Sequence, residues 1–425
     1  MHSPIRPFRQ GILALTALLA VAAGPRGAAA QSAAARPAGG YVQPCPADRF
    51  WDETLDARFQ QLQQPADGQT TPAQTSPAQP QPEPGNNGGL TAEKTRKITR
   101  SFAAVAGRPL TVETRYGRVQ VNTWTRNEIK AEVDIVARAD EDDKAQRLLD
   151  MIQVLMQENA NPEVGLLLKT QLGEMPKECW SRQRIYEINY TIWMPKSTPL
   201  KVKNSFGDVS LTGDLTGPTD LAVCYGSLRT GRLEGPRNHV RLNNGAAVLP
   251  YARQATIEAN HSRLRLEEGQ RVDLRNNGSD IDMGTVQSLA VLSKYGDVNL
   301  GTVYNLQGST GYSRFSIDKV AEQLDMKVQY CPAFEVRTTG PNFRRISVDG
   351  GYSTILLNFP DDAGFNFDVN SENGKVLMDK RLVKVHSEEN SSSSTEMQGQ
   401  YGGAQAKPAG NVNIKARYSS VSFNR

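Results

Sequence analysis

A short phrase recurs along the second half of the chain. It consists of Tyr, Phe, Asn or His, then Gly or Ser, then a variable residue and an alternating pair of apolar residues, as in YGDVNL from Tyr295. From Phe206 to Asn373 the copies follow one another at steps of 16 to 22 residues, with a period near 18. A fixed period of this size is typical of repeat architectures, in which each unit buries its apolar face only against its neighbours.

Twelve copies of this phrase occur, and Gly fills the second slot in seven of them. A change of chain direction between short strands often needs a residue at positive φ, which Gly adopts at little cost. We therefore predict turns at Gly207, Gly226 and Gly296. Two copies have one extra residue before the apolar pair, which predicts a β-bulge. The first-slot residues are predicted to stack on one another as a ladder; they are Tyr116, Phe206, Tyr225, Asn244, His261, Asn277, Tyr295, Tyr312, Tyr330, Tyr352, Asn373 and Tyr418.

Two architectures fit repeats of this length. In a parallel β-solenoid, similar to a right-handed β-helix, each unit is one coil and equivalent residues stack about 4.8 Å apart. Residues 196–425 would then form about 9–10 coils. In the alternative, an antiparallel β-meander or sandwich, each phrase is a hairpin turn. The all-β solenoid explains better why one residue type keeps one slot along the chain, and it is the fold class that we predict.

The first 30 residues have the order of a secretory signal peptide. Arg6 and Arg9 precede the apolar run GILALTALLAVAAG, and small residues follow at Ala28–Ala30 as a cleavage site. The run is short for a membrane span, and no long apolar stretch comes after it. We therefore predict an exported protein with no transmembrane segment after cleavage. Its expected location is the periplasm, the outer-membrane surface or the extracellular space.

The next two segments differ sharply in composition. Residues 31–61 contain four large apolar residues at the spacing of a short amphipathic helix, namely Phe50, Trp51, Leu55 and Phe59. Residues 62–91 consist largely of Pro, Gln, Thr, Ala and Gly, which offer little to bury. We predict a disordered linker there.

Strand-like alternation begins before the repeats. Residues 92–195 mostly alternate apolar and polar residues, and one helix is predicted within them at 140–159, where the apolar period changes. Near the end of the chain, residues 386–411 are polar and of low complexity, which predicts a disordered loop. The final strand, VNIKARYSSVSF, is expected to cap the stack.

Charge and cysteine content limit the classes of function that the chain can have. Without the three arginines of residues 1–30, 46 Lys and Arg remain against 45 Asp and Glu, which is no basic footprint for nucleic acid. The four cysteines show no metal-finger spacing, and export permits disulfides. Cys224 and Cys331 lie six units apart, about 29 Å in a solenoid, so we expect separate thiols. Cys45 and Cys179 are predicted to form a disulfide that ties the N-terminal segment to the folded body.

Several of these phrases together resemble a known group of proteins. The recurring YGxVxL phrases, the stretch VNTWTRNEIKAEVDI, the following KAQRLLDMI and then IYEINYTIWMP are similar to the bacterial "putative adhesin" β-solenoid family. The likeness covers roughly residues 99–425, without the loop at 386–411. It implies a parallel β-solenoid outside the cytoplasm and implies no catalytic residues, because the family defines none.

Motifs that carry chemistry are scarce. The sequence contains no HExxH, GxSxG, P-loop or dinucleotide-binding fingerprint, so we predict no catalytic, cofactor-binding or metal-binding residues. Four acids near the turns could serve a carbohydrate-active site, namely Asp208, Asp280, Asp282 and Asp297. The simpler interpretation is that this position faces solvent, with Asp297 beside Arg314 as an exposed ion pair worth ~0–1 kcal/mol.

These observations predict a non-enzymatic protein. We expect an adhesin or structural module that contacts a glycan or a protein of the cell surface or envelope. One alternative is a polysaccharide-active enzyme on a β-helix scaffold. The other is an accessory protein of cell-envelope signalling or stress.

Overall fold

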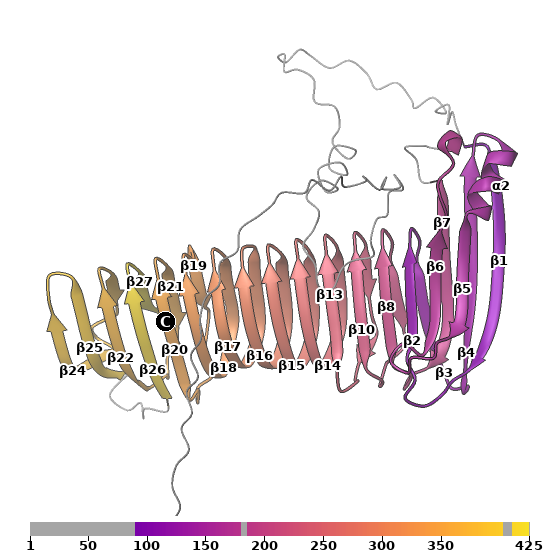
Figure 1. Ribbon diagram of the computed structural model, residues 1–425. Coiled ribbons are helices and arrows are strands. Elements are labelled where there is room, and N and C mark those ends of the chain that lie inside the picture. Colours follow the sequence, from indigo (N-terminus) through magenta and orange to yellow (C-terminus); the bar gives the residue numbers. More distant parts are fainter. Residues whose placement is uncertain (1–89, 180–184, 403–409, 425) are drawn as a thin grey trace, which may run out of the picture. The chain divides into compact units, whose positions relative to one another are not determined.

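The computed structural model describes residues 90–179, 185–402 and 410–424 (Figure 1). Within these ranges the chain forms strands β1 to β27, one α-helix and one short 3₁₀-helix, so the described part is all-β. The predicted signal peptide, the 31–61 segment and residues 62–89 of the predicted linker lie outside the described residues. No helix in the described ranges is long and apolar enough to cross a membrane.

The repeats form parallel strands in constant register. In the central repeats, between Ala246 and Gly311, partner residues in adjacent strands are 17 positions apart in the sequence, as in Ala246 opposite Arg263. The offset changes to 18 in the last pair, because the register shifts between Val303 and Asn305. Parallel pairing excludes the antiparallel meander for these repeats. The consecutive strands are β14 (Ala246–Asn260), β15 (Arg263–Asn277), β16 (Asp280–Lys294), β17 (Asp297–Gly311) and β18 (Arg314–Gln329).

Each of these strands is longer than the short strands expected from the sequence. In β15, buried and exposed residues alternate, but the alternation breaks twice, once at the exposed pair Glu267 and Glu268 and again at Gln270 and Arg271. Side chains on a flat strand alternate strictly, so the chain bends at these two points. One long strand therefore runs from corner to corner through two bends.

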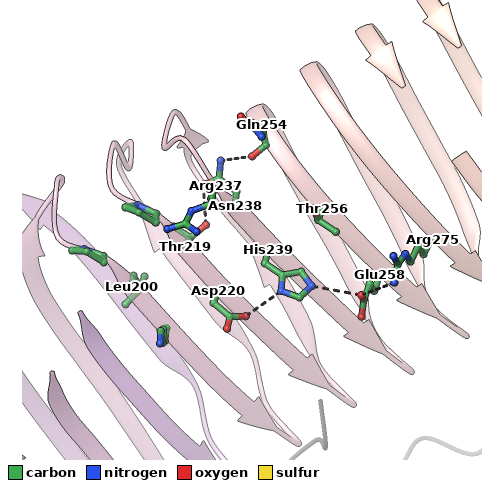
Figure 2. Close-up of a pocket in the computed structure, with 13 residues that line it drawn as sticks. Leu200, Thr219, Asp220, Arg237, Asn238, His239, Gln254, Thr256, Glu258 and Arg275 are labelled. Atoms are coloured by element: carbon green, nitrogen blue, oxygen red, sulfur yellow. Dashed lines mark hydrogen bonds and ion pairs between the residues drawn. The ribbon is translucent and has the colours of Figure 1, made fainter. Parts of the chain in front are cut away.

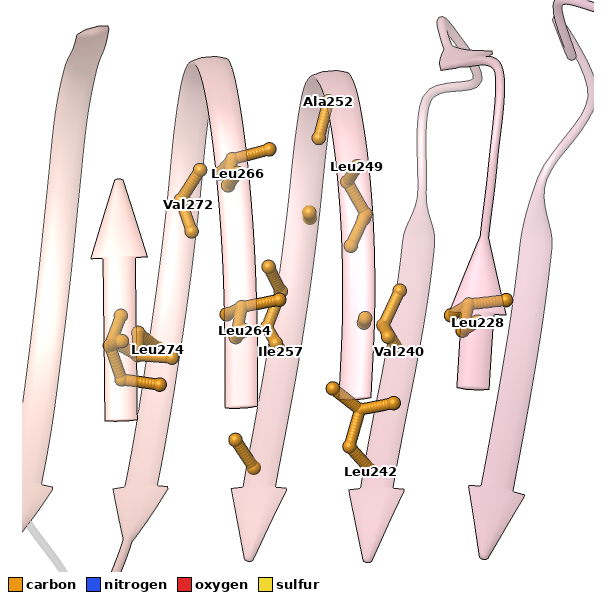
Figure 3. Close-up of a cluster of buried hydrophobic side chains, with 14 of the residues drawn as sticks. Leu228, Val240, Leu242, Leu249, Ala252, Ile257, Leu264, Leu266, Val272 and Leu274 are labelled. Carbon is orange, nitrogen blue, oxygen red and sulfur yellow. The ribbon is translucent and has the colours of Figure 1, made fainter. Parts of the chain in front are cut away.

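The core lies inside these bends. Leu264, Leu266, Val272 and Leu274 of β15 are at most 2 % exposed, and each stacks on the equivalent residue of β14 and β16 (Figure 3). Repeating this arrangement from strand to strand buries a continuous column of apolar side chains, because no single unit can bury its own.

The first part of the described chain mixes antiparallel and parallel pairing. β1 (Ala92–Ala103) pairs antiparallel with β4 (Glu128–Ala139), and β4 pairs antiparallel with β7 (Tyr186–Pro195). β7 then pairs parallel with β3 (Val119–Trp124), which starts the parallel series.

The helix within this part is shorter than predicted. α2 spans Asp142–Asp150, with Asp142 and Asp143 in its first turn, and does not continue to 159. Residues Ile152–Glu158 form β5 instead, antiparallel to β6 (Leu166–Leu172). Backbone pairing with β6 overrides a local apolar spacing that suits a helix.

The predicted loop at 386–411 is also wrong over most of its length. β24 (Val383–Asn390) and β25 (Ser394–Tyr401) form an antiparallel hairpin, while residues 403–409 lie outside the description. β25 pairs with the edge of β22 (Phe365–Glu372), and the Tyr401 ring stacks on Phe365 at 4.6 Å. A free strand edge and one aromatic anchor therefore order a polar sequence.

The final strand does not cap the stack. β26 (Gly410–Arg417) pairs on one side with β20 (Arg345–Gly351) and on the other with β22. The β24–β25 hairpin continues the sheet beyond β22 (Figure 1).

Candidate functional site

The recurring phrase lies at one corner between successive strands. Its first-slot residue, and not the Gly that follows, has the positive φ, between 47° and 62° in all eleven cases. Gly207 and Gly226 do not have positive φ, whereas Gly296 does, at 78°. The residues in the left-handed region are Tyr116, Phe206, Tyr225, Asn244, His261, Tyr295, Tyr312, Tyr330, Tyr352, Asn373 and Tyr418.

Two copies of the phrase need separate treatment. In the copy predicted to start at Asn277, the positive φ belongs to Gly278, at 66°, so the phrase begins one residue later and has no bulge. In the copy at Tyr330, an extra residue is present, because Ala333 and not Pro332 lies opposite Arg314.

The first-slot rings form two stacked series. Tyr116, Phe206 and Tyr225 stack at centroid distances of 5.2 Å. Five tyrosines from Tyr295 to Tyr418 stack at 4.9 to 5.5 Å. The tyrosines of the second series are 46 to 54 % exposed. Their ring faces largely cover one another, which leaves ring edges and hydroxyl groups toward solvent.

The second slot lies against the backbone of the preceding unit. A Cβ on Gly207 would lie 1.9 Å from the carbonyl oxygen of Gly117, and one on Gly226 would lie 2.0 Å from that of Gly207. Where Ser replaces Gly, its hydroxyl group bridges the units instead. The backbone N–H of Cys331 donates to Oγ of Ser353 at 3.0 Å, and that of Ser353 donates to Oγ of Ser419 at 3.1 Å. The corner is thus held by close backbone contact or by a hydroxyl ladder.

The described residues form a groove of about 490 Å³ on the outer side of strands that lead into these corners (Figure 2). It runs across β8 (Leu200–Ser205), β10 (Thr219–Cys224), β13 (Asn238–Asn243), β14 and β15. The apolar part of its lining is Pro199, Leu200 and Pro218. Most of the remaining lining is charged or polar.

A histidine lies between two carboxylates in this groove. His239 Nδ1 is 3.8 Å from Oδ1 of Asp220, and His239 Nε2 is 3.7 Å from Oε1 of Glu258. The parallel register causes this arrangement, since Asp220 is opposite His239 and Glu258 is on the next strand, two residues beyond Thr256. Figure 2 shows the imidazole ring pointing along the row between the two acids.

Basic side chains offset these acids. Arg241 Nη2 lies 2.8 Å from Oδ1 of Asp220, and Arg275 Nη1 lies 3.8 Å from Oε1 of Glu258. Arg237 and Lys201 add positive charge at the groove, and Lys201 Nζ donates to the carbonyl oxygen of Glu163 at 2.8 Å. With its two acids already matched, the groove presents surplus positive charge and several hydrogen-bond donors.

The acids singled out in the sequence lie elsewhere. Asp208 accepts hydrogen bonds at Oδ1 from the backbone N–H and the hydroxyl of Ser227. Asp297 is 4.0 Å from Arg314, and both are well exposed. None of the four lines the groove. Across the described ranges, no set of three or more His, Cys, Asp or Glu residues is arranged to hold a metal ion.

The cysteines differ from expectation. Cys179 is buried and its Sγ lies 3.8 Å from the carbonyl oxygen of Lys144. Cys45 lies outside the described residues, so the bridge between these two cysteines stays a prediction. Cys331 is a buried thiol, as expected. Cys224 is disulfide-bonded, which contradicts the expectation of a separate thiol there. The spacing of the repeats excludes only Cys331 as a partner for Cys224.

Comparison with known proteins gives a likeness in structure alone. No protein-family model and no curated protein matches the sequence. A Bacteroides fragilis structure described as a putative adhesin is 12 % identical and aligns over 77 % of this chain and 97 % of its own, with a TM-score of 0.28. A structure from Parabacteroides merdae, also described as a putative adhesin, is 8 % identical and aligns over 79 % of this chain and 97 % of its own, with a TM-score of 0.26.

A Parabacteroides distasonis structure described as a putative lipid binding protein is 12 % identical over 79 % of this chain and 98 % of its own, with a TM-score of 0.24. Identities and TM-scores are low throughout, so no residue role is transferred. The chain is similar in fold, over about three quarters of its length, to bacterial proteins described as putative adhesins.

Proposed function

We propose that this protein is an exported, non-enzymatic β-solenoid whose outer sheet face binds a glycan or a protein of the cell surface or envelope. The constant 17-residue offset between parallel strands supports the solenoid, because each step of the chain returns to the same position one strand further on. The corner residues form its ladder and have a structural role.

The groove across β8 to β15 is the observation that carries the binding role. Its charged side chains come from separate strands and are held in rows by the register, so they are positioned before any ligand arrives. Arg237 is exposed and reaches no carboxylate within ion-pair distance among the described residues. A guanidinium group so placed suits a carboxylate or sulfate on a glycan, or an acidic side chain of a protein.

One observation supports a second candidate. Asp220 and Glu258 flank His239 in the same groove, and paired carboxylates serve as acid and base in polysaccharide-active enzymes. A polysaccharide-active enzyme therefore stays the alternative.

An array of neutral and acidic glycans, probed with the purified chain, tests the proposal. We expect binding that Arg237→Ala weakens by about tenfold or more, the value of one charge-assisted hydrogen bond. Arg345→Ala is the matched control, since Arg345 occupies the same row further along the sheet, outside the groove. Equal losses in both variants would contradict the groove as the site. Release of products from a polyuronide, abolished by Asp220→Asn, would favour the enzyme.

A further inference from the structure

Two tryptophans lie side by side on the outer side of the first parallel strands. Trp193 of β7 and Trp124 of β3 have their ring centroids 6.5 Å apart and their ring planes inclined by 30°. Trp193 lies between the buried residues Ile192 and Met194, so its side chain points away from the core. Both tryptophans are partly exposed. Large aromatic side chains usually fill a core, whereas these two face outward together.

The side chains beside this tryptophan pair are neutral and polar. Asn122 of β3 lies directly opposite Trp193, and Thr212 of β9 (Val209–Thr212) lies opposite Asn122. The adjoining row, two residues back along the same three strands, consists of Thr191, Gln120 and Ser210. Between them, these amide and hydroxyl groups can donate and accept hydrogen bonds, as the hydroxyl groups of a sugar do.

The charges on the β4 side of the pair are matched within the protein. Nζ of Lys130, which is opposite Trp193 on β4, lies 2.7 Å from Oε1 of Glu132. Nζ of Lys97 lies 3.0 Å from Oε2 of Glu132 and 3.9 Å from Oδ1 of Asp134. Two cations thus face two carboxylates, and this surface differs from the groove, which presents surplus positive charge.

The two indole rings are held in place by their own contacts. Nε1 of Trp124 donates to the carbonyl oxygen of Glu128 at 2.7 Å. Cζ of Arg126 lies 5.3 Å from the centroid of the Trp124 ring, and Nζ of Lys130 lies 5.1 Å from that of Trp193. Cation–π contacts at exposed sites are weak, so a ligand that packs on the indole rings can replace these long side chains.

We propose that Trp124, Trp193, Asn122 and Thr212 form a binding site for a neutral glycan. The apolar C–H face of a pyranose ring packs on an indole ring, and the sugar hydroxyl groups exchange hydrogen bonds with Asn122 and Thr212. Two indole rings among amide and hydroxyl groups present a small apolar area, which suits sugar rings better than a protein interface of standard size. The site goes beyond the groove proposed above, because none of its residues lines that groove.

Tryptophan fluorescence and calorimetry of the full chain test the site directly. The sequence contains four tryptophans, so the double variant Trp51→Phe, Trp180→Phe retains only Trp124 and Trp193. The probes are neutral oligomers of glucose, of mannose and of galactose. With at least one of them we expect a saturable change in the emission of the double variant and the same Kd by calorimetry of the wild-type chain. Neither saturable emission change nor binding heat with any probe at up to about 10 mM would overturn the proposal.

Single variants then locate the binding. Trp193→Ala and Asn122→Ala should each weaken the affinity by at least about tenfold, because one removes a stacking surface and the other a hydrogen-bonding amide. Asn299→Ala is the matched control, since Asn299 is an exposed amide in the row of Gln120 further along the same outer face. Arg237→Ala alters the groove and should leave the binding of neutral oligomers unchanged. Equal losses in Asn122→Ala and Asn299→Ala, or a loss in Arg237→Ala alone, would overturn the assignment to the tryptophan pair.

Discussion

A Cβ on Gly296 would lie 2.2 Å from the carbonyl oxygen of Ser279, one strand away, and the φ of Gly296 is 78°. Gly296→Val therefore meets both a backbone clash and a strained conformation. We expect a loss of at least ~1–3 kcal/mol in the free energy of unfolding, measured by urea denaturation. Gly311→Ala is the control, because a Cβ on Gly311 would lie 3.5 Å from its nearest neighbour, the carbonyl oxygen of Gln329. This substitution should lower the free energy of unfolding by well under 1 kcal/mol. Equal stability of the two variants would show that Gly296 is not required at the corner.

At Tyr312, we expect the usual order of stability of Ala and Gly variants, in which the Ala variant is the more stable, to be absent or reversed. This residue has a φ of 55° and stacks between Tyr295 and Tyr330. Tyr312→Ala loses about 1–3 kcal/mol of stacking and keeps the left-handed backbone, whereas Tyr312→Gly relieves that backbone by about 1 kcal/mol. We expect the Gly variant to be at least as stable as the Ala variant in thermal unfolding.

An ordinary strand residue should show the opposite order. Phe315 is buried in β18 and stacks on Phe334 at 5.5 Å, without positive φ. Phe315→Gly should be less stable than Phe315→Ala by about 1 kcal/mol. The same order at both positions would contradict the role assigned to the first slot.

The hydroxyl ladder predicts a cost at Ser353. Its Oγ accepts from the N–H of Cys331 and donates to the carbonyl oxygen of Gly351, at 3.0 and 2.7 Å. Ser353→Ala leaves a buried N–H without its acceptor, which we expect to cost about 1–3 kcal/mol in chemical denaturation. Ser309→Ala, on the outer side of β17, should change stability by less than about 0.5 kcal/mol.

Tyr190 predicts a loss of stability at alkaline pH. Burial raises the pKa of this phenol to about 12, although hydrogen bonding with Thr170 and Thr114 opposes the rise. Above pH ~10 the unfolded chain releases this proton and the folded chain retains it, so stability falls as pH rises toward 12. The wild-type chain should lose about 1 kcal/mol more than Tyr190→Phe between pH 9 and 11, measured by urea unfolding. Parallel pH profiles would contradict this assignment.

The order of the repeats could be predicted from the sequence, because the alternating apolar pair, such as Val298 and Leu300, recurs at a regular spacing and is visible without any partner strand. The left-handed φ of Tyr312 could not. Tyr adopts this conformation rarely, and here stacking and a 3.1 Å bond from its N–H to the carbonyl oxygen of Gln329 hold it. The β5 and β25 strands were missed for a related reason, since each depends on a partner edge distant in sequence.

The groove was missed because its residues carry no local motif. Asp220, His239 and Glu258 each look like an isolated polar residue in a strand. Asp220 and His239 are 19 residues apart, however, which is the offset between their two strands, so aligning the units residue by residue would have placed them in one row. Glu258 would have fallen in the next row, opposite Arg241. Charged residues of both signs at equivalent positions of adjacent repeats are the sequence signal that indicates such a groove.

The constant 17-residue offset has a consequence for the length of the chain. Removing residues 278–294 would bring Asp297 opposite Arg263, in the register that Asp280 now occupies, with every core column intact. The stack of strands can therefore be lengthened or shortened by whole repeat units of 17 residues. Duplication of such a unit would lengthen the outer sheet face without a change at any corner.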